Sequence, residues 1–97
     1  MNAKLGIYKD CSSNEPTKTY ECKRLLFGVS KKALSISKNM QDKNEEEQIE
    51  LLVDLLQTIF PDFEADEINY IDANELGQFV NEIVQSTNAE LNKSSKN

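Results

Sequence analysis

The fold is decided by residues 44–60, which read NEEEQIELLVDLLQTIF. Asn44 is a preferred helix-capping residue, and the three glutamates after it complement the positive end of a helix dipole. Apolar side chains then recur at helical spacing and form one broad stripe: Ile49, Leu52, Val53, Leu56, Ile59 and Phe60. Pro61 follows and pushes the residue before it out of the helical region. These residues predict a helix that forms the centre of the core.

Another helix is predicted before this segment, from Leu26 to about Met40. Its apolar residues also recur at helical spacing: Val29, Ala33, Ile36 and Met40. Still earlier, residues 4–9 alternate polar and apolar side chains, and residues 17–24 are rich in threonine and tyrosine. Both patterns are typical of strands. Turn-forming residues separate them, so we expect an antiparallel hairpin with Lys9 opposite Lys18 and Cys22 opposite Leu5.

The segment after Pro61 predicts a short acidic turn or helix within residues 62–70. Asp72 and Glu75 then have the spacing of a capping box, which opens a third main helix. One face of that helix is apolar: Leu76, Phe79, Val80, Ile83 and Val84. Residues 92–97 have no apolar anchor and are predicted to be a disordered tail.

Together these patterns predict a mainly α fold in a chain of 97 residues. We expect a single helical domain over residues 1–91, with three main helices and the short acidic turn or helix. A short N-terminal β-hairpin, at about residues 4–25, precedes the helices.

The composition argues against catalysis and against bound cofactors. The chain has no histidine, which is the commonest general base and the commonest metal ligand. Serine–histidine and cysteine–histidine pairs are therefore excluded within it, and no glycine-rich phosphate loop is present. In the expected hairpin Cys11 lies in the loop, too far from Cys22 for a disulfide. Two free thiols, no metal site, no cofactor and no enzyme activity are expected.

Residues 64–75 match a twelve-residue calcium loop only in part. Asp72 and Glu75 fall at positions 9 and 12. Ile68, however, offers no ligand at position 5, and Asn69 stands at position 6, where glycine is needed. The capping box explains the same two acids, so we predict no specific calcium binding.

Charge is segregated along the chain. Residues 1–43 carry nine basic and four acidic residues, a balance of +5, whereas residues 44–97 carry two basic and thirteen acidic residues, a balance of −11. This asymmetry favours either docking of the two halves within one molecule or head-to-tail assembly of a homo-oligomer. Basic residues near aromatic ones also occur in nucleic-acid-binding proteins. In this chain the aromatics are few and the acidic half would repel phosphates, so nucleic-acid binding is not expected.

The helix of residues 44–60 has more apolar residues than one contact face needs. Leu51 and Leu55 lie together, about 100° around the helix from the stripe through Leu52 and Leu56. We therefore predict that Leu51 and Leu55 bind a partner. No apolar run approaches the roughly 20 residues needed to span a membrane.

Three segments carry a family resemblance. They are residues 17–25 (TKTYECKRL), residues 49–60 followed by Phe63, and residues 66–72 (DEINYID) with the helix over 75–84. In layout, size and acidic character the chain resembles the tail assembly chaperones of long-tailed bacteriophages, particularly those that infect Gram-positive bacteria. No catalytic or binding motif of that family can be assigned to individual residues of this chain.

The resemblance implies a non-enzymatic assembly factor of the host bacterial cytoplasm that is absent from the mature virion. Such a factor binds and solubilises the tape-measure protein and helps to recruit the major tail protein around it. Family members are often also made as a longer product by ribosomal frameshifting. The alternative function is a small regulatory protein that binds a host protein or nucleic acid.

Overall fold

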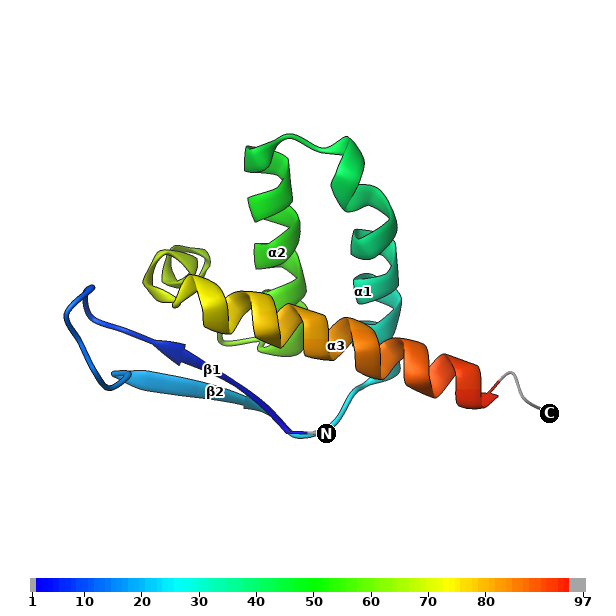
Figure 1. Cartoon of the computed structure of the whole chain (residues 1–97), viewed down its shortest axis with the longest axis horizontal. Helices are drawn as coiled ribbons and strands as arrows, with labels where there is room; N and C mark the ends of the chain where they lie inside the picture. Colours follow the sequence, from blue (N-terminus) through cyan, green and yellow to red (C-terminus); the bar gives the residue numbers. More distant parts are fainter. Residues whose placement is uncertain (1, 95–97) are drawn as a thin grey trace.

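The computed structural model describes residues 2–94, and within them it confirms the predicted mainly α fold (Figure 1). In chain order the elements are β1 Ala3–Ile7, β2 Lys18–Cys22, α1 Phe27–Asn39, η1 Met40–Asp42, α2 Glu45–Ile59, η2 Ala65–Tyr70 and α3 Ala73–Ser94. The elements η1 and η2 are short 3₁₀ helices. The predicted acidic turn or helix within residues 62–70 corresponds to η2.

The long helix α3 lies between the other elements. In Figure 1, α1 and α2 stand side by side and α3 runs across them near one end of the pair. The β-hairpin lies along the opposite side of α3, with β1 in contact with it. A two-stranded hairpin is marginal in water by itself, so α3 supplies the surface that supports it.

The core forms where α3 crosses the α1–α2 pair and meets the hairpin. Every main element contributes buried apolar residues to it, including Leu5, Tyr20, Val29, Ala33, Ile36, Leu55, Leu56, Phe60, Phe63, Phe79 and Ile83. Aromatic rings connect the layers. The ring centroids of Tyr20 and Phe60 lie 5.0 Å apart, and those of Phe60 and Phe79 lie 5.7 Å apart. These separations are typical of favourable aromatic pairs.

The hairpin register differs from the prediction by two residues. Leu5 pairs with Tyr20 and Ile7 pairs with Lys18, whereas we expected Cys22 opposite Leu5. The strand β1 ends at Ile7, and the N–H of the next residue, Tyr8, donates to the carbonyl of Tyr70 at 2.7 Å. A shift of two residues keeps every side chain on its predicted face, so the alternation still describes the buried side.

The helix starts follow the predicted capping chemistry with one difference. Asn44 and Glu47 form a capping box at α2, since each side chain accepts from the other residue's backbone N–H. Asp72 Oδ1 accepts from the backbone N–H groups of residues 74 and 75 and so caps α3. Glu75, which we expected to complete that box, accepts from the Tyr8 hydroxyl at 2.6 Å.

The C-terminal end of α3 also differs from the prediction. The helix continues through Ser94, so residues 92–94 are helical where a disordered tail was expected. Residues 95–97 of that predicted tail lie outside the described residues.

Candidate protein-interaction surfaces

The two predicted partner-binding residues do not form an exposed surface. Leu55 is only 1% exposed and belongs to the core, and Leu51 is half-buried against it. The ion pair between Lys32 of α1 and Asp54 of α2, at 2.6 Å, shows that α1 covers this side of α2. The expectation of a free face is therefore wrong for Leu55. The segment needs a broad apolar circumference because α1 packs along α2, and Phe79 of α3 contacts Phe60 at the C-terminal end of α2.

The exposed part of α2 lies instead at the beginning of its predicted core stripe. Leu56 and Phe60 are buried where α3 crosses, as the contact between Phe60 and Phe79 shows. Val53, one turn earlier on the same face, is half-buried, and Ile49, two turns earlier, is 49% exposed. The stripe thus continues beyond the part of α2 that α3 covers.

The helix α3 also has half-buried apolar residues beside its buried face. Val80 and Val84 are half-buried and follow the buried Phe79 and Ile83 by one position, about 100° around the helix. Glu75, which bonds to Tyr8 of the hairpin, marks the opposite flank of α3. Val80 and Val84 therefore lie on the flank of α3 opposite the bond from Tyr8 to Glu75.

We call this region the α2–α3 corner and define it by Ile49, Val53, Val80 and Val84. Its edge is acidic, because Glu46 and Glu50 of α2 are exposed beside Ile49 and Val53. Exposed apolar side chains with a charged rim are typical of protein-binding surfaces.

Another apolar surface lies at the start of α1. Leu26 is 61% exposed and Phe27 is 71% exposed, the highest values among the large hydrophobic residues that the structure describes. Lys31 Nζ lies 5.9 Å from the centroid of the Phe27 ring. Lys23 and Arg24 are exposed just before it. We call Lys23, Arg24, Leu26, Phe27 and Lys31 together the basic ridge.

The basic ridge also carries an unusual helix start. Leu26 is the N-cap residue of α1 and makes no side-chain capping hydrogen bond, and the first turn contains no acidic residue. The helix dipole and the neighbouring lysines therefore add positive potential around two exposed apolar side chains.

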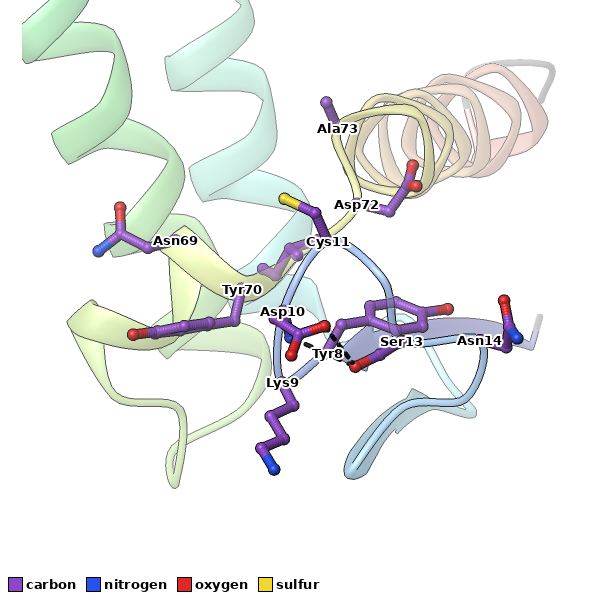
Figure 2. A pocket seen from close by; sticks show the side chains of 11 residues that line it. Tyr8, Lys9, Asp10, Cys11, Ser13, Asn14, Asn69, Tyr70, Asp72 and Ala73 are labelled. Carbon is purple, nitrogen blue, oxygen red and sulfur yellow. Dashed lines mark hydrogen bonds between the residues drawn. The ribbon is translucent and has the colours of Figure 1, made fainter.

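A pocket of about 730 Å³ lies at the other end of the molecule (Figure 2). Its walls come from the loop after β1, the last residues of η2 and the first residues of α3. We call it the acidic pocket and define it by Tyr8, Asp10, Tyr70 and Asp72. Tyr70 is 50% exposed. Lys9 also lines the pocket, but in Figure 2 its side chain points away from both aspartates.

Hydrogen bonds hold the pocket walls in place. The Tyr8 N–H donates to the Tyr70 carbonyl, and the Tyr8 hydroxyl donates to Glu75, which raises the pKa of Tyr8. Side-chain and backbone hydrogen bonds from Ser12 lower the pKa of Asp10, so that carboxylate stays ionised at neutral pH. These bonds reach Asp10 through Oδ1, and Asp72 also uses Oδ1 to cap α3. None of these bonds uses the Oδ2 atom of either carboxylate.

Some charges of the basic half pair with charges of the acidic half within the molecule. Lys18 pairs with Glu67 at 3.3 Å, and Lys32 pairs with Asp54, so both ion pairs join the basic half to the acidic half. Glu67 also accepts from the Tyr20 hydroxyl at 2.5 Å. Burial opposes its charged form, but the bonds from the Glu64 backbone, Tyr20 and Lys18 outweigh burial and lower the pKa of Glu67.

Within residues 2–94, no group of three or more histidine, cysteine, aspartate or glutamate residues is arranged to hold a metal ion. The calcium-like segment folds as the 3₁₀ helix η2 followed by the cap of α3. Cys11 is exposed and Cys22 is buried; both are free thiols, and burial raises the pKa of Cys22.

Comparison with known proteins finds no matching family model, no matching curated protein and no matching solved structure. Within residues 2–94, none of the helices combines the length and the apolar character that crossing a membrane requires.

Sequence reasoning missed both the basic ridge and the acidic pocket. The sequence signal for the ridge is the apolar run Leu25-Leu26-Phe27 directly after Lys23 and Arg24, at a position where a polar N-cap is usual. The pocket has no comparable signal, because its walls come together only through the tertiary contact between Tyr8 and Tyr70.

Proposed function

We propose that this chain is a tail assembly chaperone of a long-tailed bacteriophage that binds its client at the α2–α3 corner. The observation that carries the proposal is the apolar stripe of α2 that continues beyond its buried part, from the half-buried Val53 to Ile49, which is 49% exposed. A corner between crossing helices suits the apolar face of a third, amphipathic helix. The resemblance of the sequence to this family supplies the identity of the client.

The client in this proposal is the tape-measure protein, whose long apolar helices need cover before the tail tube surrounds them. Binding covers the client's apolar face, and the chain's net charge of −6 keeps the complex soluble. The chaperone acts in the host bacterial cytoplasm, without cofactor or catalysis, and is absent from the mature virion. The major tail protein is the second partner that it helps to recruit.

Co-expression with the tape-measure protein tests the proposal. The test variant carries Ile49→Asp and Val84→Asp, which place two charges in the corner. Gln85→Asp is the matched control, because Gln85 is exposed and adjacent to Val84 on the same helix. We expect the tape-measure protein to be soluble with the wild type and the control, and to move to the insoluble fraction with the double variant.

Circular dichroism of each variant establishes that it is folded before the result is interpreted. A folded double variant that keeps the client as soluble as the wild type does would contradict the proposal. A simpler observation bears on the same point: the gene should lie between those for a major tail protein and a long, helix-rich tape measure.

A further inference from the structure

The basic ridge and the acidic pocket are complementary in charge and in chemistry. The ridge presents the exposed Phe27 with Lys31 beside its ring. Lys23 and Arg24 are exposed a few residues earlier in the chain, and Lys23 pairs with Glu21 at 3.7 Å. The pocket is lined by the half-exposed Tyr70 and by Asp10 and Asp72; in Figure 2 the Tyr70 ring points away from Asp72. Aromatic rings pack favourably on one another, and cations approach both carboxylates and ring faces.

The ridge and the pocket of one molecule cannot meet each other. The pocket lies at the first residues of α3, whereas α1 begins beside the C-terminal half of that helix (Figure 1). With 22 residues, α3 separates the two regions along most of its length. Both surfaces therefore need a partner from outside the molecule.

We propose that the basic ridge of one copy of this chain docks into the acidic pocket of a second copy. The occupant of the pocket is Phe27, with Arg24 and Lys31 placed to reach Asp10 and Asp72. A volume of about 730 Å³ is ample for an aromatic side chain together with part of a basic one. The docked carboxylates also lie near the N-terminus of α1, which has no acidic residue or side-chain cap of its own.

This contact is heterologous, because each copy uses a different surface on its two sides. A pair of docked copies still has one free ridge at one end and one free pocket at the other. Further copies can therefore add to either end and form a row, unless the row closes into a ring. The α2–α3 corner is not part of the contact, so every copy in such a row keeps its client surface free. The proposal goes beyond the proposed function and does not depend on the identity of the client.

Two variants block the two sides separately. Phe27→Glu removes the ridge's aromatic residue, and a glutamate in the first turn of α1 suits the helix dipole, so the fold is retained. Tyr70→Arg removes the pocket's exposed ring and adds a charge that repels the ridge. Its backbone carbonyl still accepts from Tyr8. Ile49→Asp serves as the control, because it changes the α2–α3 corner alone.

Sedimentation velocity of the purified chain at low salt, over roughly 10 µM to 1 mM, covers the range in which weak contacts become populated. We expect the wild type and Ile49→Asp to assemble with rising concentration, and each blocked variant to associate at least tenfold more weakly. An equimolar mixture of the two blocked variants should form dimers and nothing larger, since each supplies the surface that the other lacks. Raising the salt to about 0.5 M should weaken every assembly.

Three results would overturn the proposal. The first is a wild type that stays monomeric over the whole concentration range at low salt. The second is assembly of Phe27→Glu or Tyr70→Arg as strong as that of the wild type, which would place the contact elsewhere. The third is a mixture of the blocked variants that remains monomeric. None of these measurements involves the tape-measure protein, so failure of the docking proposal is distinct from failure of the proposed function.

Discussion

The two ends of the α1–α2 pair are held in different ways. At the end crossed by α3, polar and aromatic contacts join residues far apart in sequence: Tyr8 bonds to Glu75, and Tyr20 bonds to Glu67 and packs on Phe60. At the distal end, residues 41–47 are all exposed. Local bonds hold that end, namely the Asn44 capping box and the bonds from Gln48 to the carbonyls of Met40 and Lys43.

This difference indicates where the molecule is free to bind. Long-range contacts define the global fold, whereas a region held by local bonds can open at lower free energy than global unfolding. The uncovered stripe of α2 emerges toward the distal end, where it has few tertiary partners to lose. The crossed end supplies rigidity, and the distal end supplies accessible apolar surface.

The largest expected effect comes from placing a charge in the crossed end. Leu55→Asp should unfold the domain at 25 °C, because burying an unpaired carboxylate costs several kcal/mol, comparable with a small domain's total stability of about 5–15 kcal/mol. Leu56→Asp should do the same. Ile49→Asp in the same helix should leave the fold intact, since Ile49 is half exposed.

Circular dichroism with thermal melts distinguishes these variants. If Leu55→Asp melted close to the wild type, Leu55 would not be a core residue, and the original prediction of a partner-binding Leu51–Leu55 face would be restored.

An intermediate effect is expected at Glu67, which joins η2 to the hairpin. Its pKa is lowered below the ordinary value of 4.5, so its contribution to stability is complete above that pH and is lost as the pH falls through the lower, folded-state pKa. Glu67→Gln should therefore reduce the free energy of unfolding by about 1–2 kcal/mol at neutral pH. The difference in free energy of unfolding between Glu67→Gln and the wild type should become smaller at acid pH.

Urea unfolding at about pH 7 and about pH 3 measures this gap. A constant difference between wild type and Glu67→Gln at both pH values would show that the carboxylate charge is not what Tyr20 and Lys18 stabilise.

The smallest effect is expected at the distal end. Asn44→Ala removes the cap of α2 and should cost about 1 kcal/mol. Because the bonds there are local, amide hydrogen exchange should speed up in the first turn of α2 while the amides of β1 and β2 keep their protection. Equal acceleration throughout the chain would mean that both ends unfold as one unit and would remove the contrast between them.

The elements of this fold could be predicted from sequence because their signals are local. Spacing of apolar residues identified the helices, and Asn44 and Pro61 marked the limits of α2. The register of the hairpin was predicted two residues away from the observed one, and no local pattern signals that Tyr8 leaves the ladder and bonds to the distant Tyr70.

The candidate surfaces were harder to predict for a related reason. The pattern of α2 identified a broad apolar circumference, but only the positions of α1 and α3 decide which part of it stays exposed. Leu55 and Ile49 therefore exchanged their expected roles: the supposed surface residue is buried, and a supposed core residue is half exposed.

The bonds between the hairpin and the later elements have a consequence for the order of folding. Tyr8 and Tyr20 find their partners at residues 67–75, so both strands leave the ribosome long before those partners exist. At about 5–20 residues per second, synthesis of the 47 to 67 intervening residues lasts roughly 2–13 s. A lone two-stranded hairpin is marginal, and unpaired strand edges attract other chains. The exposed charges of Lys4, Glu21 and Lys23 along these strands would then act as gatekeepers against misassembly during synthesis.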